Sequence, residues 1–248
     1  MHISKLQHKI VRTVGQALAT FQMIENGDKI MVCLSGGKDS WTLLEMLSLI
    51  QKRAPISFSV MGLNIDPGFP NYENHKIAAY CQAQGFEYKM IAADFPKIIA
   101  ENNTRKNGFC SFCARLRRGM IYTTAKKLGI TKIALGHHRE DFNETLLMNL
   151  FFSGQLKSMS PKYTTDDGAH VIIRPLVYTA EQDIIEYATG RFPIIDCACD
   201  IGKSESHQRK RMKKLIAELE KETPDIKSNM LNSLGNIQQK HFPTKPST

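Results

Sequence analysis

Short apolar segments of strand length alternate with segments of helical periodicity, and this alternation restricts the fold more than any other feature of the chain. Apolar runs of strand length lie at 29–34, 56–65, 87–92, 132–135 and 171–173. Between these runs, residues at helical spacing indicate helices at 43–50, 75–84, 114–128 and from after His138 to Phe152. Strands that alternate with helices predict an α/β fold with a largely parallel sheet flanked by helices.

Helical segments also lie on both sides of this pattern. Leu6, Ile10 and Val14 recur at helical spacing near the N-terminus, and Met212 and Ile216 do so near the C-terminus. Residues 179–182 (TAEQ) fit a capping box, which would open a helix that runs to about residue 188. We therefore predict an N-terminal helix at 1–27, an α/β domain at 28–178 that carries a first cysteine pair, and a helical part at 179–248 that carries a second.

A glycine-rich loop joins the first predicted strand to the helix after it. Its members are Ser35, Gly36, Gly37, Lys38, Asp39 and Ser40. The two glycines permit backbone conformations that turn N–H groups towards an anion, and the helix N-terminus adds partial positive charge. Lys38 would add a full positive charge, and Asp39 is a candidate ligand of Mg²⁺. A plain helix N-cap in a tight turn is the alternative, and the spacing does not match the Walker A motif.

Two further polar segments follow predicted strands. Asp66 begins the segment Asp-Pro-Gly-Phe-Pro after the second strand, and His137, His138 and Asp141 follow the fourth. Ligands of parallel α/β sheets bind at the carboxyl ends of the strands, so we expect these residues to share one site with the glycine loop. They are candidates for contacts with a nucleotide or a base. The alternatives are a turn-forming aspartate and histidines that pack in the core or cap a helix.

Four of the six cysteines form two close pairs, which indicates metal or redox chemistry. The pairs are Cys110 with Cys113 and Cys197 with Cys199, whereas Cys33 and Cys81 occur singly in apolar surroundings and are predicted core residues. Four thiolates would close a structural zinc site, whereas three would leave one iron of a [4Fe–4S] cluster open. Counting the cysteines does not choose between these metals.

The charge of the chain favours a polyanionic partner. The formal net charge is +9 and the isoelectric point is about 9.2. Candidate phosphate contacts are Arg115, Arg117 and Arg118 beside the first cysteine pair, and Arg209, Lys210, Arg211, Lys213 and Lys214 in the strongest basic run. A solvated helix face is the alternative for either group. The N-terminal residues lack the apolar segment of a signal peptide, and no apolar run could span a bilayer, so we expect a cytoplasmic protein without a membrane partner.

Taken together, these motifs resemble one enzyme family. The matching stretches are MVCLSGGKDS, PGFP, CSFCARLRRGMIY, KIALGHHREDFNETLLMNLFFSG, VIIRPL and FPIIDC. They are similar to the tRNA 2-thiocytidine synthetase (TtcA) family of PP-loop ATP pyrophosphatases. The resemblance implies a Rossmann-like fold of the adenine nucleotide alpha hydrolase type. It also implies that the loop at 35–40 binds ATP through its pyrophosphate, and that ATP is cleaved between the α and β phosphates.

The resemblance further implies thiolation of cytidine 32 of tRNA to 2-thiocytidine. Its cofactors would be Mg²⁺, held by Asp39, and a [4Fe–4S] cluster on three cysteines. Cys110 and Cys113 match two of these ligands, and Lys38 and Asp39 match catalytic positions of the nucleotide loop. A cysteine desulfurase would supply the sulfur, and the enzyme would be a homodimer.

The third cluster ligand lies where this chain departs from the family pattern. The family has C-x-x-C-G-S after the Phe-Pro-Ile-Ile stretch, whereas this chain has Cys-Ala-Cys-Asp-Ile-Gly at 197–202. Cys199 is the predicted ligand, with Cys197 as the alternative. The altered loop leaves open which base is modified, and three other functions are alternatives. These are a PP-loop uridine thiolase, a lysidine-forming ligase that would need neither cysteine pair, and a zinc-stapled tRNA-binding protein without catalysis.

Overall fold

A six-stranded sheet organises the computed structural model, which describes residues 2–101, 109–195 and 207–241. The strand order is β3-β2-β1-β4-β6-β5. The strands are β1 (Lys29–Cys33), β2 (Ser59–Asp66), β3 (Tyr88–Ala92), β4 (Lys132–Ala134), β5 (Lys162–Thr164) and β6 (Val171–Ile173). All neighbouring strands are parallel except β5, which pairs antiparallel with β6. The predicted α/β fold with a largely parallel sheet is therefore confirmed.

The chain divides into two compact units. The first comprises Met1–His138 and Ser160–Glu205, and it contains the sheet. Its helices are α1 (His2–Thr20), α2 (Lys38–Gln51), α3 (Asn74–Gln84), α4 (Phe95–Glu101), α5 (Phe109–Leu128) and α7 (Glu181–Ala188). The second unit comprises Arg139–Met159 and Ser206–Thr248. It contains α6 (Arg139–Ser153), α8 (His207–Glu222), α9 (Ile226–Ser233) and the short 3-10 helix η2 (Gln239–His241). These units group the chain differently from the ranges 1–27, 28–178 and 179–248, which stay a prediction.

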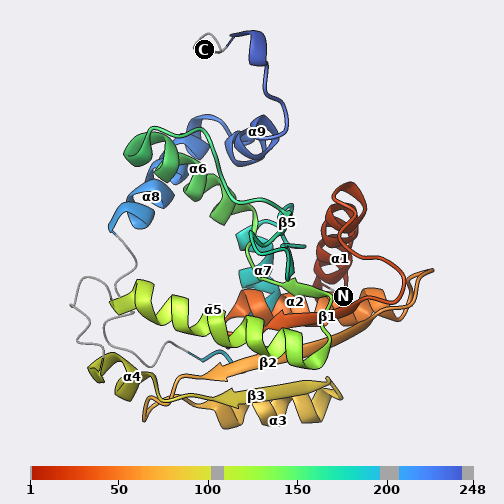
Figure 1. Ribbon diagram of the computed structural model, residues 1–248. Helices are drawn as coiled ribbons and strands as arrows, with labels where there is room; N and C mark the ends of the chain where they lie inside the picture. Colours follow the sequence, from red (N-terminus) through yellow and green to blue (C-terminus); the bar gives the residue numbers. More distant parts are fainter. Residues whose placement is uncertain (1, 102–108, 196–206, 242–248) are drawn as a thin grey trace. The chain divides into compact units, whose positions relative to one another are not determined.

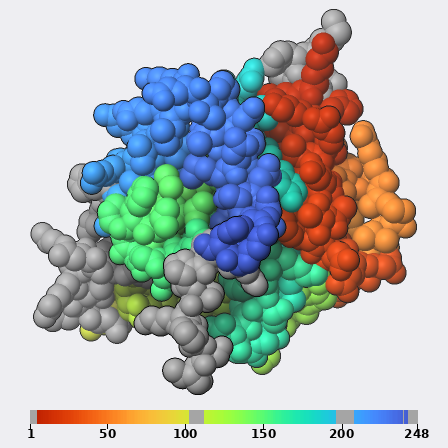
Figure 2. Space-filling model, turned by 90° about the horizontal axis from the view of Figure 1, so that it is seen from above, coloured from red at the N-terminus to blue at the C-terminus, as the bar shows by residue number. Residues whose placement is uncertain are grey.

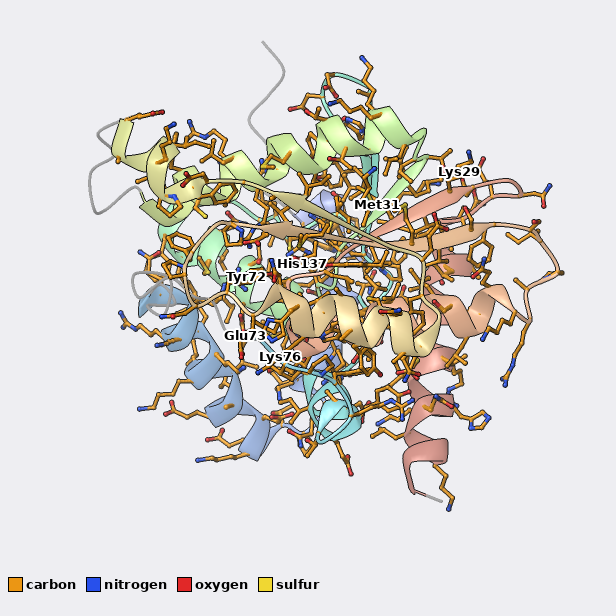
Figure 3. The ribbon with its side chains drawn as sticks, turned by 90° about the horizontal axis from the view of Figure 1, so that it is seen from below. Lys29, Met31, Tyr72, Glu73, Lys76 and His137 are labelled. Carbon is orange, nitrogen blue, oxygen red and sulfur yellow. The ribbon has the colours of Figure 1, made fainter. Side chains whose placement is uncertain are left out.

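The main core lies between the sheet and helices α4 and α5. Met31, Leu63 and Ile133 come from three neighbouring strands, and each is at most 1% exposed. They pack with Phe95 of α4 and Ala125 of α5, and α5 crosses this face of the sheet (Figure 1). Met31 lies inside this layer (Figure 3). Because successive strand residues point to opposite faces, one continuous apolar face is covered here.

Helix α2 covers the opposite face of the sheet. Aromatic side chains there join α2 to α7 and to the residues that follow α7. The rings of Trp41 and Phe192 stack with centroids 6.2 Å apart, and the ring of Tyr187 meets Phe192 edge-on at 6.0 Å. The guanidinium of Arg191 lies 4.8 Å from the centroid of the Tyr187 ring and binds both carboxylate oxygens of Glu45 on α2. These contacts hold the residues that lead from α7 to position 195 against the start of α2.

In the second unit, α6 contacts both α8 and α9. Figure 2 shows the green α6 segment beside the blue segments of α8 and α9. The buried side chain of Asn143 donates a hydrogen bond of 2.8 Å to the backbone oxygen of Lys227 on α9. Arg209 of α8 lies 3.2 Å from a carboxylate oxygen of Asp141 and 3.0 Å from one of Glu144. Burial raises the pKa of Glu144, and the nearby Arg209 opposes this shift. The ion pairs therefore join α6 to α8 within this unit.

Several element boundaries differ from those expected. Helix α5 begins at Phe109, so the first cysteine pair lies inside the helix instead of in a loop before residue 114. Helix α4 and strand β5 were not expected. The predicted capping box at 179–182 is wrong, because Ala180 is the N-cap of α7 and no side chain caps the helix. The hydroxyl of Thr179 instead lies 2.8 Å from that of Thr13 on α1, a contact between distant parts of the chain. None of the helices described is both long and apolar enough to cross a membrane.

Candidate active site

The glycine loop lies between the end of β1 and the start of α2, as predicted. Gly36 has a φ of +86°, which favours glycine. A Cβ atom at this position would also lie 2.9 Å from the Cβ of Ile195. Gly37 is the N-cap of α2, and no side chain caps the helix. Because the first N–H groups of a helix have no intrahelical acceptor, this end of α2 is suited to an anion.

Two hydroxyl groups hold the loop together. The Ser40 Oγ donates a 2.9 Å hydrogen bond to the backbone oxygen of Gly37 and lies 3.3 Å from the Ser35 Oγ. The backbone N–H of Ser35 donates to the Ser40 Oγ, and that of Gly37 donates to the Ser35 Oγ, both at 3.3 Å. The two serines therefore keep the loop closed around its glycines.

A charged cluster lies at the start of α2. The Lys38 Nζ is 3.0 Å from the Asp39 Oδ1 and 3.4 Å from the Glu181 Oε1 at the start of α7. The Nε2 of the buried His138, in the turn after β4, lies 3.8 Å from the Asp39 Oδ1 and 3.9 Å from the Glu181 Oε1. Three segments distant in sequence thus place four polar side chains around one point. Lys38, Asp39 and His138 were predicted site residues, and the structure brings them together.

A missing side chain permits this convergence. A Cβ atom on Gly136 would lie 3.1 Å from backbone atoms of both Asp39 and Ser40. Backbone atoms cannot move aside as a flexible side chain can, so the turn after β4 needs glycine to approach α2 this closely. The predicted grouping of the glycine loop with His138 rests on this contact.

Asp66 and His137 are already engaged within the first unit. Asp66 ends β2, and its carboxylate accepts hydrogen bonds from the Gly68 backbone N–H (2.9 Å) and from the Asn74 side chain. His137 accepts a 3.1 Å hydrogen bond at Nδ1 from the Nε of Arg174. This bond requires an unprotonated Nδ1. Asp141 belongs to the second unit, where it pairs with Arg209.

The first cysteine pair lies at the start of α5, where positions 110 and 113 are one helical turn apart. Cys113 is half-buried at the edge of the main core. Arg117, one turn further along, lines a cavity of about 50 Å³ together with Ser35 of the glycine loop and Cys33 of β1. The Arg117 Nε is buried and has no hydrogen-bond partner among the described residues. Helix α5 therefore brings the region of the first pair next to the glycine loop.

Cys33 is unsuited to thiolate chemistry, although it lines that cavity. Burial raises the pKa of its thiol to about 12, and the charge of Arg117 only partly opposes this shift. Because a thiolate is the nucleophile and the metal ligand, such a thiol is inert near neutral pH. This agrees with its predicted role as a core residue, and the buried Cys81, whose pKa is also raised to about 12, behaves alike.

The second cysteine pair, Cys197 and Cys199, lies outside the described residues. The chain leading to it is described as far as Ile195, whose backbone N–H donates a 3.0 Å hydrogen bond to the carbonyl of Gly36. Only one residue separates Ile195 from Cys197 in the sequence. The glycine loop is therefore joined directly to the segment that precedes the second pair.

The donor groups present suit the two implied metals. Thiols one helical turn apart are suitable ligands of an iron–sulfur cluster or of zinc. The Asp39 Oδ1 is buried and accepts no hydrogen bond from the described residues, although Lys38 is near, which suits a carboxylate that meets a hard cation. Within the described ranges, which leave out the second pair, no three His, Cys, Asp or Glu side chains are arranged so that they could hold a metal ion together.

The candidate tRNA contacts differ in their surroundings. Arg115 and Arg118 are exposed on α5, and Arg115 lines a groove of about 600 Å³ beside β3. Lys210 and Lys213 are exposed on α8. By contrast, Arg117 is half-buried and Arg209 pairs with two carboxylates.

The comparisons with known proteins agree on one family. A model of the PP-loop domain matches residues 6–196. The chain is 47% identical over 235 residues to the tRNA-cytidine(32) 2-sulfurtransferase of Geobacter sulfurreducens, covering 94% of this chain and 91% of that protein. It is 44% identical over 239 residues to the protein of the same name from Syntrophotalea carbinolica, covering 96% and 92%. The chain belongs to the tRNA-cytidine(32) 2-sulfurtransferase family.

The fold is also that of a solved tRNA thiolase. The U34-tRNA thiolase NcsA from Methanococcus maripaludis, solved with its [4Fe–4S] cluster, superposes with a TM-score of 0.75 over 97% of this chain and 80% of that one. The sequence identity is 21%, so this likeness establishes the fold alone. The chain is thus an enzyme of the sulfurtransferase family with the expected PP-loop fold. The glycine loop at 35–40 is called the PP loop below.

Three residues of this candidate site are not among the site residues predicted from the sequence. Ile195 looks like an ordinary apolar residue, and only the fold places it against Gly36. Gly136 follows a strand as many turn glycines do. Glu181 was interpreted as part of a capping box, although its carboxylate faces Lys38. The one available signal was its position in the first turn of an amphipathic helix.

Proposed function

We propose that the chain uses ATP to activate cytidine 32 of tRNA and then replaces its C2 oxygen with sulfur to form 2-thiocytidine. The main support is that the segments around both cysteine pairs approach the PP loop. Ser35 shares a cavity with Arg117, one turn after Cys113, and Gly36 accepts a hydrogen bond from Ile195, just before Cys197. A base held at this loop would therefore lie near thiol ligands. The names of the relatives support tRNA as the substrate.

The PP loop is the proposed binding site for the ATP phosphates. Backbone N–H groups of the loop and of the first turn of α2 would face the pyrophosphate, with the hydroxyls of Ser35 and Ser40 beside them. Lys38 would offset the charge that builds on the departing pyrophosphate, and Asp39 would hold Mg²⁺. His137, His138, Asp66 and Asp141 stay proposed contacts of the nucleotide or the base.

The proposed reaction has two steps. The C2 oxygen of the cytidine attacks the α phosphorus of ATP, pyrophosphate leaves, and the base carries an adenylate. A sulfur nucleophile then attacks C2, the bond from C2 to oxygen breaks, and AMP leaves with that oxygen. The target base must leave its stacked neighbours to reach the site, which costs less in an anticodon loop than in a duplex.

Cys110, Cys113 and Cys199 are the proposed ligands of a [4Fe–4S] cluster, with Cys197 as the alternative third ligand. Three thiolates leave one iron open, and the cluster would there supply the sulfur for the second step. The chain's part is to hold the thiols close to the PP loop, since Cys113 lies one turn before Arg117. Zinc on four thiolates would leave no open position.

The proposed tRNA contacts are basic side chains of α5 and α8. They are Arg115, Arg117, Arg118, Arg209, Lys210 and Lys213. Exposed members would bind phosphates directly, and the buried Nε of Arg117 suits a contact deeper in the site. A cysteine desulfurase is the proposed sulfur donor, a homodimer the proposed assembly, and the reducing cytoplasm the proposed compartment.

Anaerobic purification with iron and sulfide analysis, followed by nucleoside mass spectrometry of treated tRNA, tests this function. Cys110→Ala should lose iron and 2-thiocytidine formation but keep ATP binding, because the thiolate is absent while the PP loop is intact. Asp39→Ala should do the reverse, keeping iron and losing AMP formation.

Each of these two variants is the control for the other, because each removes one half of the chemistry. Iron-free protein with bound zinc and no AMP formation in the presence of tRNA would reject the proposal in favour of a non-catalytic binding protein. A Cys110→Ala variant that still thiolates tRNA would reject the cluster alone. Formation of 2-thiouridine or lysidine instead of 2-thiocytidine would reject the choice of base.

A further inference from the structure

Glu181 is an acidic residue of the PP-loop site. It opens α7, and its carboxylate is 15% exposed. Its Oε1 lies 3.4 Å from the Lys38 Nζ and 3.9 Å from the His138 Nε2. The next acidic residue of α7, Asp183, instead pairs with Lys9 of α1 at 2.7 Å. Glu181 and Asp183 thus lie in the same turn of α7 but have different partners. Of these two carboxylates, only that of Glu181 faces the PP loop.

The ammonium of Lys38 lies between two carboxylates from different helices. It is 3.0 Å from the Asp39 Oδ1 on its own helix and 3.4 Å from the Glu181 Oε1 on α7. Formally, these three side chains together carry one net negative charge. The positive ends of the α2 and α7 dipoles stabilise both carboxylates, because each lies in the first turn of its helix. A pyrophosphate would therefore meet a lysine whose charge is more than balanced.

We infer that Glu181 makes the PP loop select the magnesium complex of a pyrophosphate over the metal-free anion. This inference rests on the proposed binding of pyrophosphate at the PP loop. Metal-free pyrophosphate carries several negative charges, so a carboxylate a few ångströms away opposes its binding. Mg²⁺ removes two of these charges and with them much of the opposition. Glu181 is thus a specificity-determining residue that acts through charge.

Two effects of Glu181 compete, and their magnitudes decide the sign. Its ion pair orders the Lys38 side chain, which favours binding of any phosphate. Its charge repels the anion, and charges about 4 Å apart interact strongly even at an intermediate dielectric constant, and more so for a multivalent partner. Ordering one lysine side chain is a smaller effect, because partly exposed ion pairs contribute little. Removal of the charge should therefore increase affinity for the metal-free anion.

Calorimetric titration of the full chain with inorganic pyrophosphate tests this inference. The dissociation constant is measured once with Mg²⁺ and once with a chelator. The quantity compared is the dissociation constant with the chelator divided by that with Mg²⁺. Glu181→Gln should lower this ratio at least tenfold, chiefly through tighter binding without Mg²⁺. Glu181→Asp keeps the charge and should keep most of the ratio. Lys38→Met should instead bind pyrophosphate without Mg²⁺ more weakly than the unaltered chain does.

Asp183→Asn is the matched control, because it removes the same charge from the same helical turn but faces α1. Its ratio should equal that of the unaltered chain. An equal ratio in Glu181→Gln would overturn the inference, as would an equal fall in Asp183→Asn. If Glu181→Gln does not fold, Glu181→Ala removes the same charge and takes its place in the comparison. Pyrophosphate binding without tRNA thiolation would reject only the proposed function, whereas thiolation without pyrophosphate binding would reject only this inference.

Discussion

At the scale of the residue, Gly36 shows how a short motif depends on a distant neighbour. The sequence predicted a glycine that allows an unusual backbone, and the φ of +86° agrees. It did not predict Ile195, which occupies the place of a side chain and binds the Gly36 carbonyl. The loop conformation is therefore set partly by the segment before the second cysteine pair. The sequence was enough to predict the need for glycine at position 36, but not its contact with Ile195.

Gly36→Ala should destabilise the protein, and Gly15→Ala is its matched control. Alanine at a positive φ is strained by about 1–2 kcal/mol, and the new Cβ would also press on Ile195. Gly15 lies in α1 with no atom within 4 Å of an added Cβ, so alanine there should stabilise by about 0.5–1 kcal/mol. Urea unfolding measures both changes, and equal stabilities of the two variants would contradict this account.

At the scale of the element, helix α5 combines three tasks along its length. Its first turns carry Cys110 and Cys113, Arg117 reaches the cavity beside the PP loop, and Ala125 packs in the main core. The apolar spacing predicted the helix from residue 114 only. The cysteines are not strong helix formers, whereas Phe112 and Cys113 pack against the main core. Tertiary contacts therefore favour a helix before residue 114 where local propensity does not.

Arg115→Ala should weaken tRNA binding and reduce its dependence on salt. Arg115 is exposed and lines a groove, so its loss should remove about one phosphate contact and lower the slope of log affinity against log salt by about 1. Lys126→Ala, on the same helix but outside the groove, should leave the slope unchanged. Filter binding at several salt concentrations measures the slope, and identical slopes in both variants would count against the phosphate contact.

At the scale of the whole molecule, buried thiols make stability depend on pH. Burial raises the pKa of Cys33 and of Cys81 to about 12, from about 9 in an exposed chain. Between about pH 9 and pH 12, the unfolded chain loses thiol protons that the folded chain keeps. The free energy of unfolding should therefore fall as pH rises above 9, by up to about 1.4 kcal/mol per pH unit for each thiol.

A comparison of the unaltered chain with Cys81→Ala isolates this effect. Both proteins are unfolded in urea at pH 8 and pH 10, and the loss of stability between the two pH values is compared. The variant should lose less, since it has one buried thiol fewer, while other titrating groups contribute equally to both proteins. An equal loss in both would show that the Cys81 thiol titrates alike in the folded and unfolded chains.

Local patterns determined much of this protein. The alternation of apolar runs with helical segments was enough for a largely parallel α/β sheet. The segment 35–40 was recognisable as a candidate anion-binding loop because strand, glycines and helix are contiguous in sequence. The same holds for the spacing of Cys110 and Cys113. Such features depend on residues within a few positions of one another, which is the range over which sequence patterns are informative.

Tertiary structure alone decided which distant groups meet at that loop. Glu181, Ile195 and Arg117 come from three segments that the sheet topology brings together, and no local pattern marks their contacts. The predicted capping box failed for the same reason, because the Thr179 hydroxyl bonds to Thr13 across the fold instead of capping its own helix. Contacts between distant segments depend on how whole elements pack, and packing is a property of the complete set of buried side chains.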